Sequence, residues 1–154
     1  MNTIKVFCFG FGQVAKHFVK KIINQNLTLD LSVTSRQETH RETFEGISFT
    51  SYEFENDKFD RDINSKIKEA DYILVSVPPI LGEDIVIKNF KDSLKTIKAK
   101  WITYLSATSV YGDHNGEWVD ERSETKPSTL NGKNRLKAEN DWQVFSKKNN
   151  LPLQ

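Results

Sequence analysis

The sequence predicts an α/β protein in which a parallel sheet lies between two layers of helices. Strand-like and helix-like segments alternate along the 154 residues, and the strands are apolar almost throughout, as in sheets that are buried on both faces. Right-handed crossovers fold such a chain onto both faces of its sheet. We therefore expect one doubly wound, three-layer sandwich over residues 1–154, a length that suits a single domain.

Each segment has a periodicity that indicates its structure. The first strand is a β-branched and aromatic run closed by Gly10, and the next segment carries two apolar rows at helical spacing. The third strand–helix repeat gives the weakest signal, whereas Pro78 and Pro79 clearly prevent the fourth strand from continuing. We expect strands at 3–10, 29–36, 46–54, 71–79 and 99–108, and helices at 13–26, 62–70, 83–94 and 133–148.

The last four residues, LPLQ, look like the start of another strand. A chain that stops as a strand begins predicts a longer protein, in which a substrate-binding portion follows residue 154.

The amino-acid composition limits which kinds of binding partner and which cellular compartment are expected. The 22 basic residues nearly balance the 21 acidic ones, so the net charge of +1 indicates neither a nucleic-acid nor a membrane partner. Cys8 is the only cysteine, and we expect it to be a small buried hydrophobe rather than half of a disulfide or a metal ligand. No stretch approaches the ~20 apolar residues of a membrane helix, and no signal peptide is present. These features predict a cytoplasmic protein without a metal site.

The first strand and helix are joined by a glycine motif. Gly10, Gly12 and Ala15 form G-x-G-x-x-A, the pattern in which a tight turn brings the backbone close to a pyrophosphate at a helix N-terminus. This context predicts a Rossmann-like dinucleotide site, although glycines also serve ordinary turns. The expected contacts are Gly10, Phe11, Gly12, Gln13 and Val14.

The end of the second strand bears on the choice of cofactor. It reads Thr34, Ser35 and Arg36, with no acid before Glu38 to accept from the ribose hydroxyls of NAD. A hydroxyl beside a guanidinium suits a 2′-phosphate, so Ser35 and Arg36 favour NADP over NAD. The alternative is that Arg36 is a solvated loop residue.

The fourth strand ends in Ser76, Val77 and Pro78, at the edge of the sheet where nucleotides bind. These three residues are candidates for lining the cofactor. The alternative is that the prolines only end the strand.

Three segments together resemble a known family. GFGQVA at 10–15, YLSATSVYGD at 104–113 and NGKNRLKAE at 131–139 are similar to the extended or atypical short-chain dehydrogenase/reductases, the NAD-dependent epimerase/dehydratase group of sugar-nucleotide enzymes. The resemblance implies a Ser or Thr three residues before VYG that holds a substrate oxygen. It also implies a Y-x-x-x-K pair, in which the Tyr is the general acid/base, and hydride transfer with the nicotinamide.

The positions that match this triad carry other residues. Ala107 stands three residues before Val110, Asn131 stands at the Tyr position and Arg135 at the Lys position. Asn has no titratable proton, and Arg does not exchange protons at ordinary pH. Arg135 retains a positive charge, so we expect it to contact cofactor ribose or phosphate. The resemblance therefore implies the fold and the cofactor, with an altered active site.

Nearby hydroxyls are candidate substitutes for the missing groups. Tyr111 could donate a proton, and Thr108 or Ser106 could hold a substrate oxygen. If the strand stays regular, Ser106 and Thr108 point away from the side of Ala107. For Tyr111, the alternative is a packing residue in the turn.

Two further residues of the following loop have open roles. His114 titrates near neutrality but stands alone between glycines, which favours an exposed residue without a catalytic role. Trp118 either packs over the substrate side or anchors the acidic loop.

Three functions follow from these residues. The first is an NAD(P)-dependent oxidoreductase or epimerase-like enzyme that acts on a small molecule, such as a sugar nucleotide, without the usual triad. The second is a dinucleotide-binding sensor or scaffold that has lost catalysis, and the third is a domain that binds another phosphorylated ligand at the glycine turn. We expect a dinucleotide and a small-molecule substrate as partners, and we allow for a homodimer.

Overall fold

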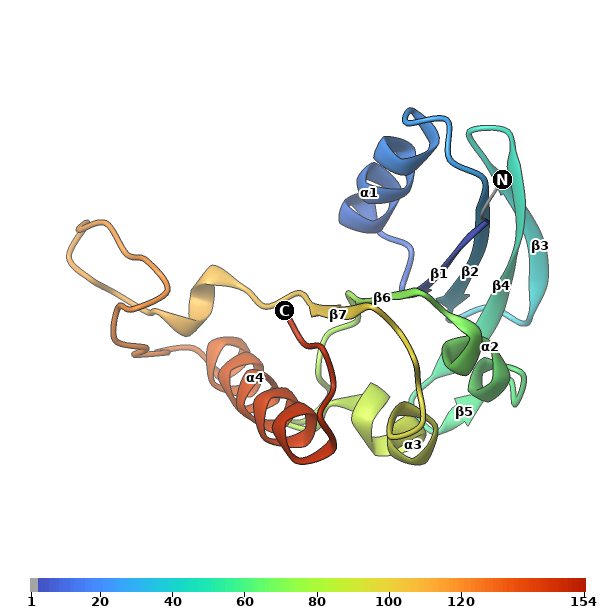
Figure 1. Cartoon of the computed structure of the whole chain (residues 1–154). Helices are drawn as coiled ribbons and strands as arrows, with labels where there is room; N and C mark the ends of the chain where they lie inside the picture. Colours follow the sequence, from blue (N-terminus) through green and yellow to red (C-terminus); the bar gives the residue numbers. More distant parts are fainter. Residues whose placement is uncertain (1–2) are drawn as a thin grey trace.

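The computed structural model describes residues 3–154, which form a mixed sheet with helices on both faces (Figure 1). The strands are β1 (Ile4–Phe9), β2 (Leu29–Ser35), β3 (His40–Phe44), β4 (Ile47–Glu55), β5 (Lys58–Phe59), β6 (Tyr72–Val75) and β7 (Trp101–Tyr104). The helices are α1 (Gln13–Ile23), α2 (Ile63–Glu69), α3 (Ile85–Leu94) and α4 (Leu130–Asn149), and a 3₁₀ turn spans Thr108–Val110. The strand order is β3-β4-β2-β1-β6-β7, with β5 paired to β4.

Two apolar cores separate the three layers. On one face α1 places Ala15 and Val19 against a cluster that includes Val6 and Cys8 of β1. On the other face α2, α3 and α4 cover a larger cluster, in which Trp142 of α4 is fully buried. Alternate residues of each strand supply the two cores, because strand side chains point to opposite faces in turn. The predicted Rossmann-like three-layer sandwich is confirmed.

The strand order reverses at β1. The chain moves outward from β1 to β2 and β4, then returns to the other side of β1 with β6 and β7. All four pairings among β1, β2, β4, β6 and β7 are parallel, so the carboxyl ends of these strands meet at one edge of the sheet. Ligands of such sheets bind in the crevice outside this edge, at the point of reversal.

At one end of the sheet the strands are antiparallel, which the sequence did not predict. Residues 40–44 form β3, an antiparallel edge strand that pairs with β4, and β4 is followed by the short antiparallel β5. Glu45 and Gly46 make the β3–β4 turn with φ of 48° and 80°, the left-handed pair that a two-residue hairpin needs. β3 was missed because its sequence, HRETF, is mostly polar and has one partly covered face only.

Several predicted boundaries also move. β6 ends at Val75 and β7 at Tyr104, earlier than the predicted 79 and 108, whereas α4 begins at Leu130 rather than 133. Thr129 caps α4 by accepting from the amide of Gly132 at 3.0 Å. At the C-terminus, the amide of Gln154 donates to the carbonyl of Ile102 at 2.7 Å, so LPLQ does begin to pair along β7.

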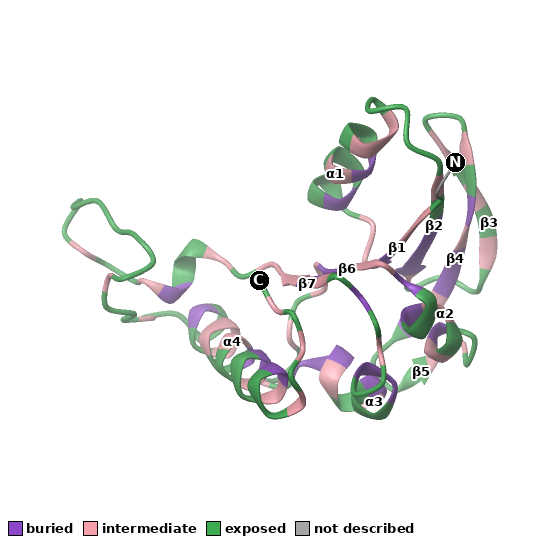
Figure 2. Cartoon of the chain, viewed as in Figure 1, coloured by how far each residue is buried: buried purple, intermediate pink, exposed green. Residues whose placement is uncertain are grey.

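The segment between the 3₁₀ turn and α4 projects from the body of the protein, and Figure 2 shows it mostly exposed. Cys8 is 0% exposed, and burial raises the pKa of its thiol to about 12, as expected of a small buried hydrophobe. Within residues 3–154, no helix has the length and apolar character needed to cross a membrane.

Candidate functional site at the carboxyl edge of the sheet

The turn after β1 requires glycine at its first position. Gly10 has φ of +85°, and a Cβ there would lie 2.8 Å from Oγ of Ser76 and 3.2 Å from Cγ1 of Val77. Two neighbouring strands hold the turn in place. The amide of Gly10 donates to Oγ1 of Thr34 at 2.9 Å, and the Ser76 hydroxyl donates to the carbonyl of Phe9 at 2.9 Å. The tight turn therefore lies across the point where the strand order reverses.

The second glycine is not required by packing. A Cβ at Gly12 would meet no atom within 4 Å, and its φ of −79° is ordinary for any residue. Gly12 is also the N-cap of α1, and no side chain caps this helix. The first amides of a helix lack partners within the helix, so those of α1 are available to an anion. Glycine here leaves open the space that a pyrophosphate would occupy, and the residues fit a dinucleotide.

The residues around this turn differ in exposure. Phe11 is held by ring contacts with Phe44 and Phe49, at centroid distances of 5.5 and 5.2 Å, whereas Val14 is 57% exposed. Of the predicted cofactor contacts, Gly12, Gln13, Val14, Arg36 and Pro78 are exposed, and Gly10, Phe11, Ser35, Ser76, Val77 and Arg135 are half-buried.

At the end of β2, Ser35 and Arg36 follow Thr34 at the same edge of the sheet. The Ser35 hydroxyl accepts from the Ser51 hydroxyl at 3.1 Å, and the amide of Gln37 approaches it at 3.4 Å. The guanidinium of Arg36 makes no hydrogen bond or ion pair with residues 3–154. Arg36 is therefore a cation free to meet an anion next to the glycine turn.

Arg135 is oriented toward the protein interior. Its Nη1 donates to the phenol oxygen of Tyr104 at 3.2 Å and to the carbonyl of Leu105 at 3.0 Å. Asn131, one turn earlier on α4, is exposed. Arg135 thus ties the start of α4 to the carboxyl end of β7. Burial raises the pKa of Tyr104, and the nearby guanidinium opposes this rise.

Tyr104 belongs to a network that sequence reasoning missed. Its ring packs against Trp142 at 6.0 Å, and Nε1 of Trp142 donates to Oδ2 of the buried Asp84 at 2.9 Å. The other carboxylate oxygen of Asp84 caps α3, accepting from the amides of Val86 and Ile87. Burial raises the pKa of Asp84. The signal in the sequence was Asp84 itself, placed just before an apolar helical segment as N-caps are.

The hydroxyls after β7 do not lie on a regular strand. Because β7 ends at Tyr104 and a 3₁₀ turn begins at Thr108, the strand alternation expected for Ser106 and Thr108 does not apply. Both are exposed, whereas Ala107 and Tyr111 are half-buried. The phenol of Tyr111 has no hydrogen-bond partner in the described chain. Thr108 and Tyr111 remain predictions as catalytic residues.

The loop residues have clearer roles. His114 is half-buried, and its Nε2 lies 3.0 Å from the carbonyl of Glu124, so it is a loop-bracing residue rather than an exposed one. Trp118 is 100% exposed, so it does not anchor the loop, and its packing over a substrate stays a prediction.

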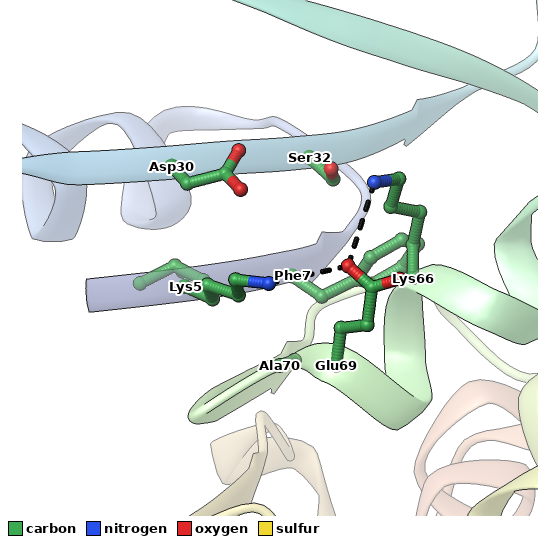
Figure 3. A pocket seen from close by; sticks show the side chains of 8 residues that line it. Lys5, Phe7, Asp30, Ser32, Lys66, Glu69 and Ala70 are labelled. Atoms are coloured by element: carbon green, nitrogen blue, oxygen red, sulfur yellow. Dashed lines mark hydrogen bonds and ion pairs between the residues drawn. The ribbon is translucent and has the colours of Figure 1, made fainter. Parts of the chain in front are cut away.

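A small cavity lies at the opposite edge of the sheet, near the starts of β1 and β2. Figure 3 shows Lys5, Asp30 and Ser32 from the starts of β1 and β2 near Glu69 of α2, whose carboxylate meets Lys5 at 3.3 Å. This ion pair lowers the pKa of Glu69. The cavity has a volume of about 10 Å³, room for one water, so it is no ligand site.

No protein-family model matches the sequence, and no curated protein matches it. The fold is similar to several solved structures. A functionally unknown conserved protein from Silicibacter pomeroyi DSS is 28% identical with a TM-score of 0.74, over 97% of this chain and 50% of that one.

Two epimerases from Bacillus cereus are more distant. UDP-N-acetylglucosamine 4-epimerase is 17% identical, with a TM-score of 0.72, over 97% of this chain and 51% of that one. UDP-glucuronic acid 4-epimerase in complex with NAD is 18% identical, with a TM-score of 0.72, over 97% and 54%. The chain thus spans about half the length of the structures it matches, and at these identities the likeness to the epimerases concerns the fold.

Proposed function

We propose that residues 1–154 are the NAD(P)-binding domain of a cytoplasmic oxidoreductase or epimerase-like protein, of the extended or atypical short-chain dehydrogenase/reductase type. The observation that carries this proposal is the open N-terminus of α1 beside Gly12, at the point where the strand order reverses. The fold shared with an epimerase whose structure contains NAD supports the same cofactor class.

NADP is the preferred cofactor. Arg36 is an unpaired cation at the end of β2, next to the hydroxyl of Ser35, and no acid stands there to accept from ribose hydroxyls. When bound, the dinucleotide supplies hydride transfer. The chain's own part is to hold the pyrophosphate on the amides of α1 and the 2′-phosphate on Arg36, with Ser76, Val77 and Pro78 along the adjoining edge.

The substrate is a small molecule, with sugar nucleotides as the leading class. Thr108 would hold a substrate oxygen, and the phenol of Tyr111 would pass a proton to or from it. Asn131 has no titratable proton, and Arg135 is already engaged with Tyr104 and Leu105, so neither supplies the proton.

The second candidate function is a dinucleotide-binding sensor or scaffold. The observation that favours it is the orientation of Arg135, whose hydrogen bonds serve the protein's own structure at a family catalytic position. A sensor or scaffold of this kind would bind the dinucleotide without turning over a substrate.

The cofactor proposal is tested by thermal shift of the full-length protein with NADP⁺ and NAD⁺ at matched concentrations. A ligand that binds only the native state raises Tm by mass action. We expect the larger rise with NADP⁺, and Arg36→Ala should remove the difference between the two. If neither dinucleotide changes Tm, the dinucleotide proposal fails, and the result supports a domain that binds another phosphorylated ligand.

Turnover separates the enzyme from the sensor. NADPH oxidation, and epimerisation of UDP-sugars, are measured with the full-length protein and with Tyr111→Phe, which keeps the ring and removes the proton. Loss of turnover with retained NADPH binding supports Tyr111 as the acid/base. Unchanged turnover excludes it, and binding without any turnover supports the sensor.

A further inference from the structure

The loop that joins β2 to β3, residues 36–39, carries Arg36 at the carboxyl edge of the sheet. It ends at β3, the outermost strand of the sheet (Figure 1), where His40 pairs with Ser51 of β4. The guanidinium of Arg36 has no hydrogen-bond or ion-pair partner among residues 3–154. Its position is therefore set by whatever holds the backbone of this loop.

Thr39 supplies the first anchor of the loop. Its hydroxyl donates to Oδ2 of Asp60 at 2.6 Å and accepts from the amide of Glu53 at 3.1 Å. Glu53 is the residue of β4 that pairs with Ser35, the last residue of β2, so the anchor lies level with the start of the loop. A hydroxyl does not titrate near neutral pH, and this anchor holds whether or not a neighbouring histidine is charged.

His40 supplies the second anchor, and both of its ring nitrogens face oxygen atoms. Nδ1 lies 2.7 Å from the carbonyl oxygen of Glu38, and Nε2 lies 2.7 Å from Oε1 of Glu42. A neutral imidazole has one N–H, so it can donate to only one of these oxygens. A carbonyl cannot donate, and an imidazole is a stronger base than a carboxylate. The ring that makes both hydrogen bonds is therefore the imidazolium.

These two contacts also raise the pKa of His40, the Glu38 carbonyl more than the Glu42 carboxylate. A histidine whose pKa is raised by folding keeps its bonds in full below its ordinary value of 6.5. The bonds are lost as the pH rises through the raised value. The second anchor of the loop therefore depends on a proton in the neutral to mildly alkaline range.

Glu42 is the charged side chain of β3 that faces the ring. Arg41 points to the opposite face because strand side chains alternate, and its guanidinium donates to the hydroxyls of Thr50 at 3.2 Å and Ser48 at 3.1 Å. The proton on His40 is therefore shared with a carboxylate of its own strand.

The charged groups on neighbouring elements have other partners. Glu53 of β4 forms an ion pair with Lys58 of β5, and Glu53 first and Glu38 to a smaller extent raise the pKa of that lysine. On α1, the ammonium of Lys16 lies 6.0 Å from the aromatic ring at the far end of β3. The titration of His40 is therefore governed by the Glu38 carbonyl and by Glu42.

We propose that His40 is a positioning residue for Arg36 and that loss of its proton weakens binding of the 2′-phosphate of NADP, an inference that rests on the proposed function. The imidazolium fixes the carbonyl of Glu38, two residues after Arg36, and Thr39 fixes the next residue. A loop that is already ordered loses less conformational entropy when it binds an anion. When His40 is neutral, one of its two bonds is lost, and binding must order the loop again. NAD has no 2′-phosphate and should not respond to this proton.

The test is calorimetric binding of NADPH and NADH to the full-length protein and to His40→Gln, between about pH 6 and pH 9. Glutamine can donate to one of the two oxygens but does not titrate. The 2′-phosphate gains charge near pH 6, but this change is common to both proteins and cancels in the ratio of their Kd values. We expect His40→Gln to bind NADPH at least about fivefold more weakly than wild type at pH 6, and within about twofold of it at pH 9. For NADH, the ratio should stay within about twofold throughout.

Glu42→Gln links the effect to the proton rather than to the ring. Without the carboxylate the pKa of His40 should fall, which NMR of the imidazole signals measures in the protein without cofactor, with His40→Gln as the assignment. The pH at which wild-type-like NADPH binding is half lost should fall with it. His114→Gln replaces another half-buried histidine that contacts a backbone carbonyl, and as the matched control it should leave both Kd values unchanged.

A double-mutant cycle identifies the route of the effect. In an Arg36→Ala protein, His40→Gln should cause no further loss of NADPH binding, because His40 acts through Arg36. A loss that persists there, or one that is equal for NADPH and NADH, makes His40 a residue of general loop stability and overturns the inference.

The remaining outcomes separate this inference from the proposed function. A protein that binds NADPH with a Kd ratio that is constant from pH 6 to pH 9 overturns the inference alone, as does a His40 ring that NMR shows to be neutral at pH 6. A protein that binds neither dinucleotide overturns the proposed function together with the inference. Tm and circular dichroism verify that each variant is folded.

Discussion

The β1–α1 turn and the β7–α4 region lie at the same edge of the sheet, but they differ in whether their polar groups have hydrogen-bond partners within the protein. At the first, α1 begins at Gly12 with no side-chain cap and with free space around the glycine. At the second, α4 is capped by Thr129, and Arg135 is bonded to Tyr104 and Leu105. This difference in hydrogen bonding indicates where a ligand is expected to bind. A region that leaves hydrogen-bond donors open is built for an external partner, whereas one that satisfies them internally is built for stability.

In the β7–α4 region, the largest loss of stability is expected from substitutions of Trp142. This side chain is fully buried between β7 and α3. Trp142→Ala removes its packing and leaves Oδ2 of Asp84 without a donor, so we expect the free energy of unfolding to fall by about 3–5 kcal/mol. Trp142→Phe keeps most of the ring and should cost about 1–3 kcal/mol, the penalty for the unpaired carboxylate oxygen. Urea denaturation measures both, and wild-type stability for Trp142→Phe would show that the hydrogen bond contributes nothing.

Gly10→Ala should distort the glycine turn between β1 and α1. A Cβ at φ of +85° is strained and meets Ser76 and Val77, so stability should fall by about 1–3 kcal/mol. The turn would shift with it and lose dinucleotide binding. The matched control is Gly12→Ala, whose Cβ has no neighbour, so that only the N-cap preference for glycine over alanine should lower its unliganded stability, by less than about 1 kcal/mol. Equal losses for the two variants would remove the distinction between a structural and a ligand-binding glycine.

Substitution of Arg135 tests whether the β7–α4 region has a structural role. Arg135→Ala removes two hydrogen bonds from a half-buried charged group, and the free energy of unfolding should fall by about 1.5–3 kcal/mol. The lysine side chain of Arg135→Lys is shorter and lacks the planar guanidinium, so its ammonium should not reach both acceptors and should recover only part of this loss. Denaturant curves without any cofactor are the measurement, and wild-type stability for the Ala variant would contradict the structural role.

The pH dependence of stability should show the smallest effect, at Asp84. Burial raises its pKa in the folded state above the unfolded value of about 3.9. Its contribution is therefore fully present below that unfolded value and is lost as the pH rises through the raised folded value. Asp84→Asn should remove this loss, so the two unfolding free energies should diverge in slope just above pH 4. Parallel curves there would exclude a raised pKa.

The central strands and the glycine turn were predictable because their signals are local. Nearly continuous apolar runs identify β1 and β6, and G-x-G-x-x-A requires only one strand, one turn and one helix. β3 was missed because a polar edge strand lacks such a run, and it depends on the Glu45–Gly46 turn for its pairing.

The β7–α4 contacts could not be read from the sequence. Tyr104 and Arg135 are 31 residues apart, and Asp84 and Trp142 are 58 residues apart. Their meeting depends on how α4 packs on the sheet. Thr34 was similarly passed over as a support of the glycine turn, since its partner Gly10 lies 24 residues away on another strand.

The most direct test of the open turn is calorimetric binding of NADPH to the wild-type protein and to Gly12→Ala. The variant's added methyl group would enter the space proposed for the pyrophosphate, while no atom of the protein lies within 4 Å of it. We predict that wild type binds NADPH and that Gly12→Ala, which stays folded with only a small fall in Tm in the absence of ligand, binds it at least tenfold more weakly. Equal affinities for the two proteins would contradict a dinucleotide site at this turn.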